Sequence, residues 1–195
     1  MSSIGQTLAN YWDVIVVGGG NAGFCAAHAA RELVPRVLIL EKAPAEWAGG
    51  NSYFTAGAMR VAHNGLDDLS QLVPGLTPEQ LTTTDIPAYP ESAFLDDMFR
   101  VTEGRTRPDL ARLIVGESLA TARWLKTKGI HWRLQYDRQS FLVDGRHRFW
   151  GNLPLGVQGG GVSLMDQHLA AARAGDIQIA YDSGVVGFIQ RPGGA

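Results

Sequence analysis

Short apolar runs and one helical segment alternate near the start of the chain. Residues 14–17 and most of residues 36–40 are apolar, and such runs predict strands buried on both faces of a parallel sheet. Between them, residues 22–33 place Ala22, Ala26, Ala29 and Leu33 on one helical face, and Val34-Pro35 ends the helix. The order of strand, helix and strand predicts a βαβ unit.

The middle of the chain begins with a segment rich in helix breakers. Residues 66–90 contain four prolines and three consecutive threonines, so we expect a surface loop with one helical turn after Thr77-Pro78. Two helices are expected next. Residues 91–101 carry apolar side chains at helical spacing, and residues 108–128 start with a proline suited to a first turn and end at Gly129.

Periodicity weakens in the last third. Residues 130–158 predict loop or short strand without closer assignment, and residues 163–174 predict a short helix closed by Gly175. Residues 177–181 and 185–190 alternate like strands around the turn at 182–184. We therefore expect one domain over residues 1–195, with a loose leader at 1–12. Its predicted class is Rossmann-like α/β, with a central parallel sheet, a helical insertion and a small antiparallel β element.

Composition narrows the classes of partner. The chain of 195 residues is 45% hydrophobic and 18% charged, which is ordinary for a globular protein that buries a sizeable core. A net charge of -2 gives no reason to expect a nucleic-acid partner, and no run approaches the roughly 18 apolar residues of a membrane span. Cys25 is the only cysteine, so an intrachain disulfide is impossible and a cytoplasmic location is expected.

The first chemical motif lies where the first strand meets the first helix. Gly18, Gly20 and Gly23 satisfy the pattern G-x-G-x-x-G directly after a strand. Gly18 allows a tight turn, Gly20 leaves room for a pyrophosphate against bare backbone, and Gly23 lets the helix pack close to the strand. The helix N-terminus adds unpaired N–H groups and partial positive charge, which favour a phosphate.

Glu41 supports this interpretation from the end of the second strand. A carboxylate there accepts hydrogen bonds from an adenosine ribose and repels a 2′-phosphate, so NADP is disfavoured. NAD and FAD both remain open at this point.

A second glycine cluster distinguishes these two cofactors by resemblance. The stretch 13–23, the pair Glu41-Lys42, and the loop Gly49-Gly50-Asn51-Ser52 followed by residues 55–59 resemble the FAD-binding segments of the fumarate reductase and succinate dehydrogenase flavoproteins. Residues 90–130, with the glycine-rich turn and helix at 159–169, look most like the tricarballylate dehydrogenase branch of that family. A plain NAD domain has no need of the 49–58 loop, so the resemblance implies FAD.

The resemblance assigns roles residue by residue. It implies that pyrophosphate, ribose and flavin contacts come from Gly18, Gly19, Gly20, Asn21, Ala22, Gly23, Glu41, Lys42, Gly50, Asn51, Ser52, Gly57 and Ala58, and that the backbone of Val185 meets the adenine. Family members that attach FAD covalently use a histidine where this chain has Asn51. The resemblance therefore implies non-covalent FAD.

The family also implies what lies outside this stretch of sequence. Its catalytic arginine, its carboxylate-binding residues and its capping domain match no position here, so we expect them downstream of Ala195. A small di- or tricarboxylate substrate and an electron-transfer partner are implied for the full enzyme. The strand at 14–17 should be central in a doubly wound sheet, so we expect an open apolar edge that favours self-association.

Three hypotheses remain open from the residues. The chain is the flavin-binding part of an FAD-dependent dehydrogenase or reductase, a non-catalytic fragment that binds FAD or its ADP half, or a NAD-dependent oxidoreductase.

Other polar residues carry weaker signals. The histidines at 28, 63, 131, 147 and 168 lack metal-ligand spacing, so we expect no metal site and surface or hydrogen-bonded rings. Cys25 lies near a helix start that could lower its pKa, but its alanine neighbours favour simple packing. Residues 146–148 (Arg-His-Arg) predict a solvated turn, with contact to a carboxylate substrate as the alternative. Trp124 and Trp132 are expected in a core or interface.

Overall fold

The computed structural model describes residues 11–190, and the chain divides into two compact units. Within the described part, unit 1 comprises residues 11–53 and 168–190, and unit 2 comprises residues 54–167. Most of the predicted leader at 1–12 lies outside the described residues. None of the helices in the described part is long and apolar enough to cross a membrane.

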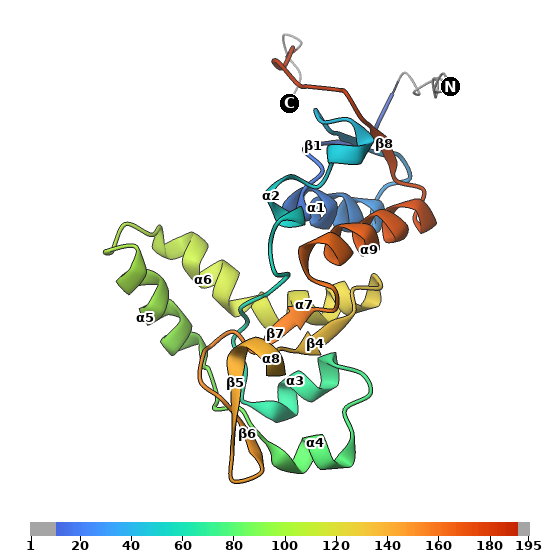
Figure 1. The fold of residues 1–195 in the computed structure, drawn as a ribbon. Helices are drawn as coiled ribbons and strands as arrows, with labels where there is room; N and C mark the ends of the chain where they lie inside the picture. Colours follow the sequence, from blue (N-terminus) through green and yellow to red (C-terminus); the bar gives the residue numbers. More distant parts are fainter. Residues whose placement is uncertain (1–10, 191–195) are drawn as a thin grey trace. The chain divides into compact units, whose positions relative to one another are not determined.

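Unit 1 is built on a three-stranded parallel sheet in the order β1-β2-β8 (Figure 1). Its strands are β1 (Val14–Val17), β2 (Val37–Leu40) and β8 (Gln178–Ala180). The central strand β2 pairs with both neighbours and buries Val37, Leu38 and Ile39. Helix α1 (Asn21–Arg31) connects β1 to β2 and contacts both strands. The predicted α/β class and the βαβ unit are confirmed.

Among the described residues, β1 pairs only with β2 and so lies at the edge of the sheet rather than in its centre. Ile15 and Val17 are each 52% exposed, so the expected open apolar edge is present. The face of α1 that carries Ala22, Ala26 and Ala29 is also exposed. The buried face of α1 is instead lined by Phe24, Ala27 and His28, because this face packs towards the sheet and the end of α9.

Two short helical elements follow β2, and one helix returns the chain to unit 1. They are η1 (Ala45–Trp47), α2 (Gly50–Tyr53) and α9 (Gly160–Ala174), whose residues from His168 onwards belong to unit 1. Within unit 1, Arg31 of α1 donates to the Gly175 carbonyl at 2.8 Å, just beyond α9. This bond joins the C-terminal ends of the two helices.

Residues 66–90 contain the helical turn predicted after Thr77-Pro78, but the rest of the segment is not simply a surface loop. They form α3 (Leu66–Leu72), α4 (Pro78–Thr83) and the short strand β3 (Thr84–Asp85). Leu69 and Leu72 are fully buried, so packing of an apolar helical face outweighs the local breakers. The prolines sit outside helix interiors, and Pro78 occupies the first turn of α4 behind a capping box of Thr77 and Gln80.

Unit 2 contains three helices in the region where two were predicted. Helix α5 (Glu91–Val101) has the predicted bounds and buries Phe94 against Tyr89 and Val115. The single helix predicted at 108–128 is instead two helices, α6 (Pro108–Gly116) and α7 (Ser118–Thr127). Ser118 closes the junction because its hydroxyl donates to the Val115 carbonyl and accepts from the Ala62 N–H.

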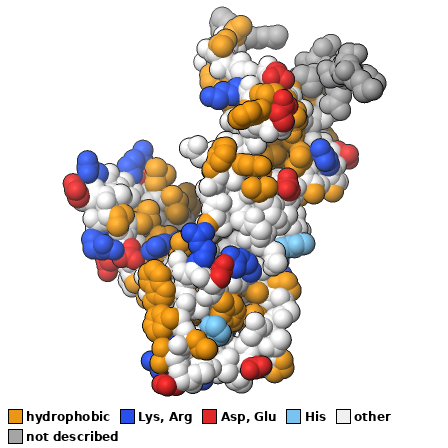
Figure 2. Space-filling model, in the orientation of Figure 1, with side chains coloured by type: hydrophobic (Ala, Val, Ile, Leu, Met, Phe, Trp, Pro, Cys, Tyr) orange, Lys and Arg blue, Asp and Glu red, His pale blue; other side chains and the backbone are white. Residues whose placement is uncertain are grey.

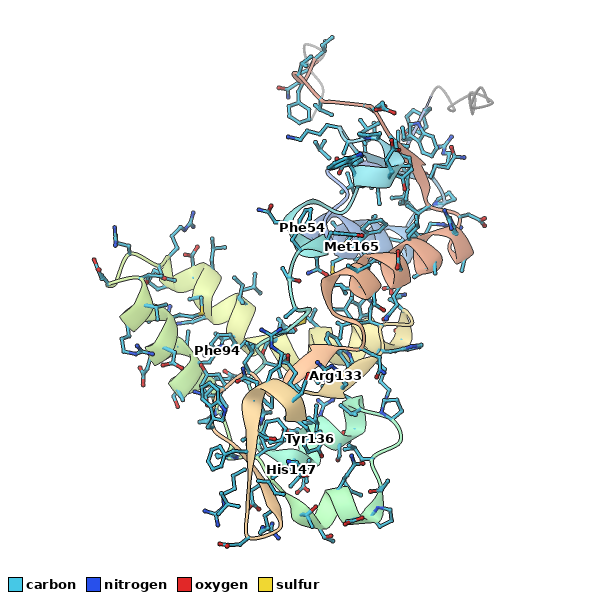
Figure 3. The ribbon with its side chains drawn as sticks, in the orientation of Figure 1. Phe54, Phe94, Arg133, Tyr136, His147 and Met165 are labelled. Atoms are coloured by element: carbon cyan, nitrogen blue, oxygen red, sulfur yellow. The ribbon has the colours of Figure 1, made fainter. Side chains whose placement is uncertain are left out.

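Two small sheets complete unit 2. One has the order β3-β6-β5, with β5 (Ser140–Val143) antiparallel to β6 (Arg146–Phe149). The other pairs β4 (Trp132–Leu134) with β7 (Leu155–Val157), also antiparallel. Helix α8 (Tyr136–Gln139) precedes the β5–β6 hairpin, and its Tyr136 ring meets His147 edge-on at 4.8 Å (Figure 3). These strands fill the segment that the sequence left unassigned.

The small antiparallel element is therefore formed elsewhere than predicted. Strand β8 confirms the prediction at 177–181, but it pairs in parallel with β2. Residues 185–190 form no strand and are exposed. Alternation alone does not make a strand, because a strand also depends on pairing with a neighbouring strand.

Candidate functional site

The glycine turn between β1 and α1 has a backbone that other residues do not fit. Gly18 has φ of +99°, and its N–H donates to the Leu40 carbonyl at 2.8 Å. A Cβ on Gly23 would overlap the carbonyl oxygen of Gly18. Gly20 is the extended N-cap of α1, with ψ of -178°. The turn thus brings α1 close to β1 and leaves bare backbone at the start of the helix.

The N-terminus of α1 is open to an anion. Gly20 offers no side-chain cap, and the first turn holds no acidic residue. The Asn21 N–H donates to Ser52 Oγ at 3.1 Å, which brings α2 against this helix end. A Cβ on Gly20 would lie 3.7 Å from Ser52 Oγ, so the space beside Gly20 is bounded by α2 without being filled. N–H groups of this kind, with the helix dipole, bind phosphate.

Glu41 is buried beside the same turn. Its Oε2 accepts from the Gly19 N–H at 2.6 Å, and its Oε1 accepts from the Ala43 N–H at 2.8 Å. A carboxylate has about four acceptor positions, so each oxygen retains capacity for a further donor. The two backbone bonds fix the orientation of the carboxylate relative to the glycine turn.

The structure brings together most of the residues predicted in unit 1. Gly18 to Gly23, Glu41 and Ser52 converge on one end of α1. Gly50 has φ of +54°, whereas the side chains of Lys42 and Asn51 are exposed. Val185 lies in the irregular segment after β8.

Comparison with known families decides the class of this arrangement. The family described as an FAD-binding domain matches residues 13–180. The chain belongs to this family. FAD is therefore the cofactor class of the domain, and the NAD alternative is disfavoured.

Relatives of this FAD-binding domain are flavin-dependent oxidoreductases. A probable fumarate reductase of Shewanella frigidimarina is 26% identical over 176 residues, which cover 90% of this chain and 26% of the relative. A fumarate reductase of Schizosaccharomyces pombe is 28% identical over 138 residues, covering 71% of this chain and 23% of the relative. The chain thus spans about a quarter of the length of these curated relatives.

Solved structures show the same fold. An open conformation of a flavocytochrome c3 fumarate reductase matches with a TM-score of 0.63 at 24% identity, covering 91% of this chain and 28% of that one. A 3-ketosteroid dehydrogenase from Rhodococcus jostii matches with a TM-score of 0.61 at 17% identity, covering 90% and 39%. At these identities the likeness concerns the FAD-binding fold alone.

Two predicted residues belong to unit 2. Gly57 has φ of +67°, and a Cβ there would lie 2.8 Å from the carbonyl carbon of Gly160. Ala58 forms an isolated antiparallel bridge with Gly156 and is exposed. This close approach is a structural reason for glycine at position 57, whereas at position 160 glycine is favoured by a φ of +73°.

The sequence analysis missed a buried polar cluster that reaches the glycine turn. His168 of α9 and His28 of α1 are both buried, with 3.3 Å between His168 Nδ1 and His28 Nε2. The Nε2 of His168 lies 2.9 Å from Asn21 Oδ1. His168 lies 147 residues from Asn21 in the sequence, so no local spacing could have indicated this contact.

Cys25 is not an activated thiol. Burial raises its pKa to about 11, so the thiol stays protonated at neutral pH, as expected for a packing residue. The described residues contain no group of three or more metal-ligating side chains.

His63 is the other unexpected histidine. It is buried in unit 2, its Nδ1 accepts from the Gly65 N–H at 3.0 Å, and its Nε2 has no hydrogen-bond partner among the described residues. It lines a cavity of about 390 Å³ together with Asp68, Glu91 and Arg123. Burial lowers its pKa, which the nearby Asp68 partly opposes.

The Arg-His-Arg run forms strand β6 rather than a turn. Arg146 binds both carboxylate oxygens of Asp85, and His147 lies 3.2 Å from Ser140 Oγ. Arg146 already has a structural partner. The face drawn in Figure 2 shows acidic and basic side chains interspersed, without a broad field of one sign.

Proposed function

We propose that unit 1 holds the ADP half of FAD non-covalently and that the protein is a flavin-dependent dehydrogenase or reductase of a small di- or tricarboxylate. The observation that carries this proposal is the convergence of the bare α1 N-terminus, Glu41 and Ser52 on one turn. Together they offer donors for a diphosphate and acceptors for a ribose.

Each part of the turn has a separate task in this proposal. The N–H groups at the start of α1 bind the pyrophosphate, and the absence of a side chain at Gly20 permits close approach. The remaining acceptor positions of Glu41 take the ribose hydroxyl protons. The negative charge of Glu41 disfavours a 2′-phosphorylated ribose.

The family resemblance supports Asn51, Ser52, Gly57 and Ala58 as flavin contacts and the Val185 backbone as an adenine contact, with Lys42 and Gly50 as further cofactor contacts. Asn51 cannot form the covalent flavin link that a histidine forms, which supports a dissociable cofactor. When bound, FAD supplies hydride transfer at its N5 atom. We assign no catalytic acid, base or substrate-binding residue within this chain.

The substrate class rests on the relatives. Those cited above are named as fumarate reductases, and another is named as an NADH:fumarate oxidoreductase. This likeness supports a small carboxylate substrate, and the resemblance of residues 90–130 to the tricarballylate dehydrogenase branch favours a tricarballylate-like substrate. An electron-transfer partner belongs to the same proposal.

Binding of FAD to the chain tests the proposal directly. Purified protein is saturated with FAD and desalted, and its visible spectrum is recorded. The variant Gly20→Ala should keep its fold, since the new Cβ meets Ser52 Oγ at 3.7 Å, but should bind FAD at least about tenfold more weakly. Gly116→Ala in α6, where a Cβ meets nothing within 4 Å, is the matched control.

Flavin absorbance retained by the wild type and the control but reduced in Gly20→Ala supports the proposal. Wild-type protein that retains no flavin contradicts it. Equal retention in Gly20→Ala contradicts the assignment of the pyrophosphate to this turn.

A further inference from the structure

Three side chains of unit 1 form a buried hydrogen-bond chain, which we call the His28–His168–Asn21 chain. Its nitrogen-to-nitrogen contact is 3.3 Å and its contact with Asn21 Oδ1 is 2.9 Å. His168 is fully buried, and the Phe24 ring stacks on it with 5.3 Å between ring centroids. The His28–His168–Asn21 chain therefore runs through the packed region between α1 and the C-terminal part of α9 and ends at Asn21, the first residue of α1.

The acceptor at Asn21 gives this chain a direction. Burial, with the neighbouring His28, lowers the pKa of His168 to about 4, so its ring is neutral at pH 7 and carries one N–H. Because Asn21 Oδ1 can only accept, the proton of His168 is on Nε2, and Nδ1 is an acceptor. His28 Nε2 then donates to His168 Nδ1.

The oxygen end of the Asn21 carboxamide faces the core. Oδ1 is turned towards His168, and Cys25 Sγ also lies 3.9 Å from it. The amino group Nδ2 is at the opposite end and donates to no other group in the described part of the chain. Asn21 directly follows the N-cap Gly20, and its own N–H is held by Ser52.

We propose that His168 is a positioning residue for FAD: it holds the Asn21 carboxamide so that its amino group donates to the cofactor's pyrophosphate. This inference rests on the proposed function, because it requires the diphosphate at the α1 N-terminus. An anion selects the donor end of an amide, so a carboxamide free to rotate would present the required end only part of the time.

Packing alone does not require histidine at position 168. A phenyl ring would stack on Phe24 equally well, but it would remove the partner that His168 gives to His28 Nε2 and Asn21 Oδ1, so His168→Phe should lower stability. If His168 were purely structural, the folded His168→Phe variant would still bind FAD with wild-type affinity. If His168 is a positioning residue, this affinity should fall.

The test compares two substitutions in the 195-residue chain by titration with FAD, followed through quenching of flavin fluorescence. His168→Phe keeps the ring and removes the donor, and should weaken FAD binding about tenfold. His168→Gln keeps an N–H donor, and should restore the affinity to within about threefold of wild type. Urea unfolding without FAD checks that both variants are folded.

A double-mutant cycle with Asn21→Ala identifies the route of the effect. If His168 acts through Asn21, the double variant His168→Phe with Asn21→Ala should bind FAD no more weakly than Asn21→Ala alone. Additive losses would overturn the inference, as would wild-type affinity in His168→Phe. In both cases the wild type still binds FAD, so the proposed function survives, whereas a wild type that binds no FAD overturns the proposed function itself.

Nitrogen NMR of the wild-type histidines tests the inference without any variant. We expect the FAD-free protein to show His168 protonated at Nε2 and unprotonated at Nδ1. The opposite tautomer would mean that Asn21 turns its amino group towards His168, and this result would overturn the inference even if His168→Phe failed to fold.

Discussion

Gly23 of α1 packs so closely against Gly18 of the preceding turn that no side chain fits between the helix and the Gly18 carbonyl. The substitution Gly23→Ala should therefore force α1 away from β1. Because backbone rather than a flexible side chain is in the way, we expect a loss of about 3 kcal/mol in the free energy of unfolding. Urea denaturation followed by circular dichroism measures this loss.

Gly184→Ala is the control for that experiment, since its new Cβ would lie 3.8 Å from Lys42 Cβ in ordinary contact. Its free energy of unfolding should stay within about 0.5 kcal/mol of the wild-type value. Equal stability of Gly23→Ala and Gly184→Ala would show that the helix tolerates displacement.

Glu41→Gln tests the carboxylate beside the turn. The amide of glutamine presents one oxygen and one amino group to the N–H groups of Gly19 and Ala43, so one of the two bonds is replaced by donor–donor repulsion. We expect about 2 kcal/mol of lost stability, together with weaker FAD binding, because hydrogen bonds to charged groups are the stronger ones. Urea unfolding and FAD titration measure the two effects, and an unchanged result in both would exclude a role for the charge.

Acid should destabilise the fold through His168. In the unfolded chain this ring takes up a proton near pH 6.5, whereas in the folded protein burial and His28 lower its pKa to about 4. Between these two pKa values the unfolded state binds more protons than the folded state. The contribution of neutral His168 to the free energy of unfolding is therefore complete above pH 6.5 and is lost as the pH falls towards 4. The expected loss is about 3 kcal/mol.

Unfolding free energies measured from pH 7.5 to 4.5 check this sign. His168→Gln should flatten the profile, and the remaining slope includes His63, whose pKa burial also lowers. A wild-type free energy of unfolding that increases as the pH falls would refute the assignment of a neutral, buried His168.

The open edge of β1 predicts self-association. Ile15 and Val17 are half-exposed on a strand that pairs only with β2 among the described residues. Ile15→Lys places a charge on this edge strand and should weaken association at least about tenfold. Sedimentation velocity at matched protein concentrations measures the extent of self-association. The control is Leu142→Lys on β5, since the Leu142 side chain is 64% exposed in the wild type. A wild type that sediments as a monomer would contradict the prediction.

Local chemistry made the phosphate turn predictable. Gly18, Gly20 and Gly23 satisfy constraints that arise within a few residues, since a positive φ, a bare N-cap and a close helix–strand contact each exclude side chains. Glu41 was predictable because a parallel strand places its last residue at the same sheet edge as the turn. The βαβ unit and a dinucleotide-binding turn followed from these residues, whereas FAD rather than NAD was implied by the resemblance of the 49–58 loop to a known family.

Tertiary packing decided the rest. Leu69 and Leu72 turned a proline-rich segment into helix because burial of an apolar face outweighs weak local propensity. Residues 185–190 form no strand although they alternate, because strand formation depends on pairing with a neighbouring strand, which a local pattern does not determine. His168 reaches Asn21 from 147 residues away, and spacing in the sequence carries no information about such a contact. The sequence by itself determined the glycine turn and its acidic neighbour, because both depend on local geometry, whereas the folded chain alone decided which buried side chains support that turn.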